Sequence, residues 1–242
     1  MKIVAHRGYS ARFPENSLLG FERAIEAGAH AVETDIRRSA DGVLVCWHDP
    51  DLRRVAGLAR EIARTPAAEL MGIALPGGAR IHRLSEVLAF LRGRAPLMLD
   101  VKIDDDEGRA AIMREVDGAA MSEQVIYGVR SARHAQALIA GAARFARLAM
   151  PAKPSALDAF PQEGLIGARL WEDQVEDASI TAIRRRGLEV WVTAGVRSCS
   201  EAPGYITAER LAALARRGVD AVLLNDVGLA AALGHRVTQE RP

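Results

Sequence analysis

Eight short runs of apolar, often β-branched residues recur along this chain, and segments with helical periodicity separate them. The runs cover residues 3–5, 31–36, 97–102, 125–129, 145–149, 165–170, 188–193 and 219–224. The helical segments cover residues 17–27, 84–91, 107–121, 132–139, 155–160, 180–186, 208–217 and 227–233. This alternation predicts an α/β protein with a parallel sheet, and eight units favour a closed eight-stranded (β/α) TIM barrel, although alternation alone leaves an open sheet as the alternative.

The alternation breaks once, after the second predicted strand. Residues 43–83 contain an extra strand candidate at 43–47 and then a loop-rich stretch with Pro66, Pro76 and two adjacent glycines. A chain of 242 residues matches the usual size of a single barrel. We therefore expect one domain over residues 1–242, with the insert at about 43–83 lying over the barrel mouth.

Composition narrows the function classes. The net charge is +1, from 32 basic and 31 acidic side chains, which argues against a nucleic-acid binder because backbone binding needs concentrated positive charge. Cys46 and Cys199 form no zinc spacing and are too few for a disulfide framework. The first residues enter a strand directly, without a signal-peptide pattern, and no apolar run is long enough for a membrane span. We expect a cytoplasmic protein that acts on a small molecule; whether it forms a homo-oligomer stays open.

Paired acidic residues lie on the second predicted strand. Residues two apart on a strand share a face, so Glu33 and Asp35 point the same way, into the barrel if the apolar Ala31 and Ile36 have been assigned correctly. Buried carboxylates need neutralisation, and a hard cation such as magnesium, calcium or manganese supplies it through oxygen ligands. Asp100 and Lys102 repeat the spacing on the third barrel strand. A slipped register or a simple Asp100–Lys102 salt bridge is the alternative structural explanation.

Two histidines lie on either side of this acidic centre. His6 follows the first strand beside Arg7, and His48 precedes Asp49 in the insert, so both are candidates for proton transfer near neutral pH. The planar guanidinium of Arg7 suits a phosphate group. Structural roles are expected for the other histidines, His30, His82, His134 and His235. Motifs typical of phosphate loops, dinucleotide sites, zinc proteases and serine hydrolases are absent from the sequence.

These clusters together resemble the glycerophosphodiester phosphodiesterase family, to which the sphingomyelinase D enzymes are related. The matching residues are His6-Arg7-Gly8, Pro14-Glu15-Asn16-Ser17, Phe21, Ala24, Gly28-Ala29, Glu33-Thr34-Asp35, Asp41-Gly42, His48-Asp49, Leu52-Arg53-Arg54, Leu84-Ser85-Glu86-Val87-Leu88 and Asp100-Val101-Lys102. They span about the first 100 residues in the family's order.

The resemblance implies a metal-dependent hydrolase on a TIM barrel. Glu33, Asp35 and Asp100 would hold one divalent cation, Mg²⁺ or Ca²⁺, with Mn²⁺ as a further option. The substrates would be glycerophosphodiesters, cleaved to an alcohol and glycerol phosphate. Two alternatives stay open: a phosphodiesterase acting on a lysophospholipid or sugar phosphodiester, and a non-catalytic barrel that keeps the metal.

The resemblance also implies roles for four further side chains. His6 and His48 would act as general base and general acid. Arg7 and Lys102 would bind the phosphate and neutralise charge on its oxygens.

The second half of the chain departs from the family pattern. Residues 191–194 lack the Asn that usually ends strand seven, where Ala194 stands here, and residues 224–227 lack the usual Thr-Asp-Arg-Pro. We therefore expect weak glycerol selectivity. If Trp171 and Trp191 face the mouth, we also expect a preference for a less polar or cationic head group.

Overall fold

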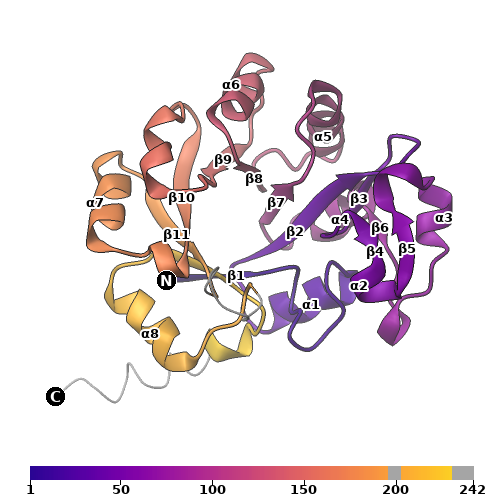
Figure 1. The fold of residues 1–242 in the computed structure, drawn as a ribbon, viewed down its shortest axis with the longest axis horizontal. Coiled ribbons are helices and arrows are strands. Elements are labelled where there is room, and N and C mark those ends of the chain that lie inside the picture. The colour runs from indigo at the N-terminus through magenta and orange to yellow at the C-terminus, as the bar shows by residue number, and fades with distance from the viewer. Residues whose placement is uncertain (196–202, 231–242) are drawn as a thin grey trace.

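The first and last barrel strands pair with each other, which closes the sheet. In a computed structural model, β1 (Lys2–Ala5) pairs in parallel with β12 (Ala221–Leu224) on one side and β2 (Ala31–Arg38) on the other. The other parallel strands, in order around the barrel, are β7 (Leu97–Val101), β8 (Val125–Val129), β9 (Ala146–Ala149), β10 (Leu165–Trp171) and β11 (Glu189–Thr193). The predicted closed barrel is confirmed, and Figure 1 looks into it.

The structure describes residues 1–195 and 203–230. Cys199, His235 and the end of the helix expected at 227–233 lie outside these ranges. Within them, no helix has both the length and the apolar character that crossing a membrane requires.

Helices surround the barrel (Figure 1). They are α1 (Leu18–Glu26), α4 (Leu84–Leu91), α5 (Asp106–Gly118), α6 (Ala132–Ala140), α7 (Asp177–Arg185) and α8 (Ala208–Arg216). Side-chain oxygens of Ser17, Asp105, Ser131 and Thr207 cap α1, α5, α6 and α8 by accepting a backbone N–H three residues further on. The helix expected at 155–160 is instead a 3-10 helix, Pro154–Ala159. It is only six residues long, because the backbone becomes extended at Phe160. Further 3-10 helices span Ile62–Arg64, Pro76–Gly78 and Glu172–Gln174.

Alternate residues of each strand face different sides of the barrel wall. Val4, Met98 and Trp191 belong to the core inside the barrel, whereas their neighbours Ile3 and Leu97 pack in the larger core beneath the helices. Polar side chains two positions beyond the inner core residues therefore point into the space above it. This alternation builds the floor of the site.

The insert forms a small unit beside the barrel with an apolar core of its own. Its elements are β3 (Leu44–Cys46), β4 (Asp51–Leu52), α2 (Arg53–Ala56), β5 (Leu58–Glu61), α3 (Ala67–Met71) and β6 (His82–Arg83). β3 pairs antiparallel with the end of β2, and β6 pairs with β3. The core side chains are Val45, Trp47, Leu52, Ile62, Leu70, Leu75 and Ile81. Because β3 returns along β2, the chain that follows it brings His48 to the cavity at the barrel mouth.

Candidate active site

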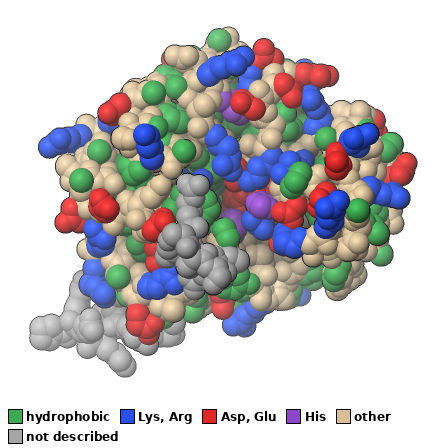
Figure 2. All heavy atoms as spheres, viewed as in Figure 1, with side chains coloured by type: hydrophobic (Ala, Val, Ile, Leu, Met, Phe, Trp, Pro, Cys, Tyr) green, Lys and Arg blue, Asp and Glu red, His purple; other side chains and the backbone are tan. Residues whose placement is uncertain are grey.

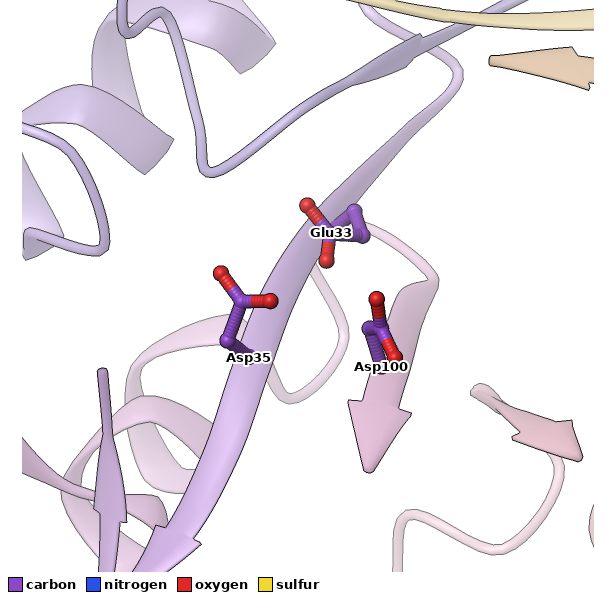
Figure 3. A group of neighbouring side chains, drawn as sticks. All are labelled: Glu33, Asp35 and Asp100. Carbon is purple, nitrogen blue, oxygen red and sulfur yellow. The ribbon is translucent and has the colours of Figure 1, made fainter. Parts of the chain in front are cut away.

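Three carboxylates converge at the end of β2 and β7. Glu33 and Asp35 lie on β2, and the strand register sets Asp35 directly opposite Asp100 on β7. One ligand oxygen from each residue lies within 4.8 Å of the others, and Figure 3 shows the three groups turned toward one space. Both β2 carboxylates are almost fully buried, with 1% exposure. The sequence prediction that these three residues form a cluster is confirmed.

Burial and neighbouring charges shift the pKa values of the three carboxylates in different directions. Burial, Asp35 and Asp100 raise the pKa of Glu33. Burial, the largest single influence, raises the pKa of Asp35 and Asp100, but the neighbouring positive groups together outweigh it, Lys102 first among them, so both pKa values are lowered. Arg7 assists at Asp35 and Arg130 at Asp100. Glu33 is therefore the carboxylate that gains most from a cation.

The donor set fits a hard divalent cation. Oxygen ligands of Mg²⁺ and Ca²⁺ lie about 2.0–2.6 Å from the ion, so ligand oxygens up to about 5 Å apart can share one. The 4.8 Å span of the three carboxylates meets that limit. A bound cation would also remove the cost of ionising Glu33. The chemistry of the residues favours magnesium, calcium or manganese over softer metals.

The two predicted phosphate-binding cations already touch this cluster. Arg7 donates its backbone N–H to Glu33 Oε2 at 2.8 Å, and its Nε lies 3.2 Å from Asp35 Oδ2. This geometry depends on a tight turn after β1, where Arg7 and Gly8 both have positive φ, 58° and 79°. Lys102 Nζ lies 2.7 Å from Asp100 Oδ2 and 3.0 Å from Asp35 Oδ1.

His6 is buried and held by an asparagine from the other end of the chain. Its Nδ1 lies 2.8 Å from Asn225 Oδ1, while Asn225 Nδ2 donates to the carbonyl of Pro203. The amide oxygen thus accepts from His6 Nδ1–H, which leaves Nε2 unprotonated. Burial, followed by the nearby Arg7, lowers the pKa of His6 to about 4, so the ring is neutral. Gly204 makes this bond possible, since a Cβ there would lie 2.0 Å from Asn225 Oδ1.

His48 sits on the insert side and is more exposed, with 34% of its side chain accessible. Its Nδ1 lies 2.7 Å from Asp49 Oδ1, and Arg54 Nε donates to the other oxygen of Asp49 at 2.6 Å. Arg54 also makes a two-pronged ion pair with Glu15, at 2.5 and 2.9 Å. Arg7 Nη1 reaches the same Glu15 carboxylate at 3.3 Å. A chain of charged contacts therefore links His48 to Arg7.

A cavity of about 240 Å³ lies between these groups. Its lining includes the two histidines, Arg7, Glu33, Asp100 and Lys102. The later strands add Arg130, Met150, Arg169, Trp171, Thr193 and Leu223. The structure thus brings the predicted site residues together at one cavity. Asp35 does not line it but contacts Arg7 and Lys102, which do.

Asn16 lies next to the cap of α1 but is not the cap itself. Ser17 is the cap of α1, and the side chain of Asn16 turns instead into the acidic cluster. Its Oδ1 accepts from Thr34 Oγ1 at 2.7 Å, and its Nδ2 donates to Asp35 Oδ2 at 3.3 Å. Asn16 adopts the left-handed conformation, with φ 54°, that asparagine tolerates better than most residues. It therefore orients Asp35.

Three of the remaining histidines lie away from the cavity, as expected. His30 Nδ1 accepts the backbone N–H of Ile3, and His82 lies within 3.6 Å of Glu86. His134 packs against Tyr127, with 3.2 Å between Nε2 and the phenol oxygen. These contacts are consistent with the structural roles expected for the three histidines.

The expectation that Ala194 and Trp191 line the alcohol side of the pocket is wrong. Ala194 is fully buried in the core beneath the helices, because Trp191 and Thr193 take the inner face of β11. Trp191 lies in the inner core and is 2% exposed, so it offers no face to a head group. Trp171 lines the cavity, but the guanidinium of Arg169 lies over its ring at 4.6 Å. This side of the pocket is cationic.

Comparisons with known proteins bear on the chemistry. Residues 6–140 match the model of the glycerophosphoryl diester phosphodiesterase family. A glycerophosphodiester phosphodiesterase of Bacillus altitudinis is 33% identical over 110 residues, 42% of this chain and 44% of the relative. An uncharacterized Bacillus subtilis protein is 51% identical over 57 residues, 24% of each chain. The matches thus span less than half the length of these curated relatives.

Solved structures match over nearly the whole chain. The glycerophosphodiester phosphodiesterase of Agrobacterium tumefaciens is 27% identical, with a TM-score of 0.78 over 96% of this chain and 99% of that one. An Oleispira antarctica phosphodiesterase in complex with the product sn-glycerol-3-phosphate has a TM-score of 0.81 at 22% identity, covering 97% of both chains. At 22% identity, the similarity to the Oleispira antarctica protein establishes a shared fold.

Proposed function

Because this chain belongs to the glycerophosphoryl diester phosphodiesterase family, we propose that it hydrolyses glycerophosphodiesters to an alcohol and glycerol phosphate. The observation that carries the proposal is the convergence of three carboxylates and two histidines on one cavity. The product found with the Oleispira antarctica relative, sn-glycerol-3-phosphate, supports the assignment of glycerol phosphate as the product here. We also infer that residues 1–242 act as one domain, with the insert supplying His48.

In this proposal, Glu33, Asp35 and Asp100 hold one Mg²⁺ or Ca²⁺. When bound, the cation polarises the phosphodiester and stabilises charge that grows on its oxygens. Asn16 keeps Asp35 in place, because its Nδ2 donates to the Asp35 carboxylate and its Oδ1 accepts the Asp35 backbone N–H. The 4.8 Å span and the raised pKa of Glu33 support this assignment.

The histidines divide the proton transfers between them. His6, neutral and with Nε2 unprotonated, accepts the proton of the attacking nucleophile. If the nucleophile is water, glycerol phosphate forms directly; if it is the adjacent glycerol hydroxyl, a cyclic phosphate forms first and water then opens it. His48 donates a proton to the departing alcohol. The neutral amide beside His6 and the carboxylate beside His48 support this division.

Arg7 and Lys102 bind the phosphoryl oxygens. Both lie against carboxylates of the cluster, so their donors point toward the same space as the cation ligands. Positive groups fixed at that point stabilise the transition state more than the ground state, because charge on the oxygens increases there.

The proposal is tested by hydrolysis of glycerophosphocholine and lysophosphatidylcholine after chelator treatment and addition of Mg²⁺, Ca²⁺ or Mn²⁺. We expect chelator to abolish turnover and one of these ions to restore it. Glu33→Gln should lose activity and bind the ion more weakly in calorimetry. Absence of turnover on every diester, with the ion bound, would instead support a non-catalytic barrel.

A further inference from the structure

Two arginines of the later strands face the cavity without a task in the proposed diester chemistry. On β8, Tyr127 and Val129 pack outward, so the alternation directs Arg130 inward. On β10, Ala168 and Leu170 pack outward, so Arg169 faces inward. Arg169 is only 3% exposed, which is rare for an arginine.

Positive charge exceeds negative charge around the cavity. Four cationic side chains line it, and three carboxylates form the acidic cluster. The cations are Arg7, Lys102, Arg130 and Arg169. A divalent ion and a singly charged diester would leave the positive excess in place. Figure 2 shows lysine and arginine side chains gathered at the hollow of this face, beside histidine.

Arg130 is held in a contact that a bound cation would compete with. Its Nη2 lies 2.5 and 2.7 Å from the two oxygens of Asp100, and Lys102 shares the same carboxylate. An ion on Asp100 would draw on those oxygens and weaken the Arg130 contact. The guanidinium, 45% exposed in its side chain, would then face an incoming substrate.

We propose that Arg130 and Arg169 form an anion subsite beside the diester site, so that the preferred leaving alcohol carries an acidic group such as a carboxylate. The inference rests on the proposed hydrolysis and adds the class of alcohol. Planar guanidinium groups bind carboxylates and phosphates through paired hydrogen bonds, and Trp171 holds one face of Arg169. The subsite gives the positively charged wall of the cavity a function. The same wall would repel a cationic head group such as choline.

The test uses two diesters that differ in one charge. Glycerol phosphate is esterified with 4-(carboxymethyl)phenol or with the matching amide, whose methylene insulates the phenol from the tail. We expect the parent enzyme to prefer the carboxylate by about 10- to 100-fold in kcat/KM, as for hydrogen bonds to charged groups. Arg130→Met and Arg169→Met should each bring that ratio down toward one, and Arg130→Lys should keep part of it. Arg144→Gln, in the exposed loop before β9, removes the same charge elsewhere and should keep the ratio.

The outcomes separate the subsite from the hydrolysis itself. Cleavage of both diesters at equal rates by the parent, or a preference that survives in both methionine variants, overturns the subsite and leaves the proposed function intact. Cleavage of neither diester overturns the proposed function. Calorimetry gives a second readout: without substrate, Arg130→Met should bind Mn²⁺ more tightly than the parent, since Asp100 has lost a competing cation. Weaker binding would mean that Arg130 only positions Asp100. If Arg169→Met fails to fold, the Arg130 variants carry the test alone.

Discussion

The two sides of the active site hold their histidines in opposite ways. On the barrel side, His6 is buried and bonded to the neutral amide of Asn225, 219 residues away. On the insert side, His48 is partly exposed and bonded to the carboxylate of its neighbour Asp49, which Arg54 anchors. Both rings use Nδ1 for this contact, so Nε2 remains for substrate in each case.

The difference teaches how one site can hold an acid and a base of the same residue type. Burial, followed by the nearby Arg7, lowers the pKa of His6 to about 4 and keeps the ring uncharged. A carboxylate partner stabilises positive charge on a ring and is the natural support for a group that must give up a proton. Surroundings, and not residue type, assign the roles.

The largest expected effect comes from removing either ring. His6→Ala and His48→Ala should each lower kcat on glycerophosphocholine by about 10²–10⁴-fold, with a smaller change in KM. A 4-nitrophenyl diester separates the roles, because its leaving group departs without a proton. On it, His48→Ala should recover most of the parent rate, whereas His6→Ala should stay impaired. Equal losses on both substrates would break the division between acid and base.

A smaller effect is expected when the two sides are made alike. Asn225→Asp sets a carboxylate beside His6, which stabilises the protonated ring and raises the pKa of His6 above 4. The base must be unprotonated, so the acid limb of the pH profile of kcat/KM should move upward. At about pH 5 we expect roughly tenfold lower activity than in the parent, with little change near pH 8. Superimposable pH profiles would show that His6 is not the base.

The smallest effects are expected along the insert side. Asp49→Asn should lower kcat on glycerophosphocholine about tenfold, as for loss of a hydrogen bond to a charged group. Arg54→Gln reaches His48 through Asp49 and should cost about threefold or less. Both losses should disappear on the 4-nitrophenyl diester if they act through His48. Persistence there would indicate that Arg54 and Asp49 act through Glu15 and Arg7 instead.

Much of the barrel and of the acidic cluster could be predicted because both depend on local periodicity. Every predicted barrel strand is present, and the shared face of Glu33 and Asp35 follows from their spacing. The same alternation would have shown that Ala194 points away from the cavity, since Trp191 and Thr193 point in. A match to a family position does not by itself fix which way a side chain faces.

Other features depend on closure of the fold and leave no local signal. Asn225 meets His6 only because β12 pairs with β1, and Gly204 must lack a side chain at that point. Arg54 meets Glu15 across 39 residues because the insert folds back toward α1. Arg130 stands where an ordinary loop residue would, directly after β8. Its contact with Asp100 needs the β7–β8 register, which sets Asp100 beside Gly128.

The pairing of β1 with β12 also has a consequence for biosynthesis. The carboxylates of β2 and β7 leave the ribosome early, whereas the amide that orients His6 emerges 219 residues after it. In the proposed mechanism, the base is therefore oriented last, because the contact between His6 and Asn225 forms only when β12 pairs with β1. A chain that ends before β12 would lack this contact.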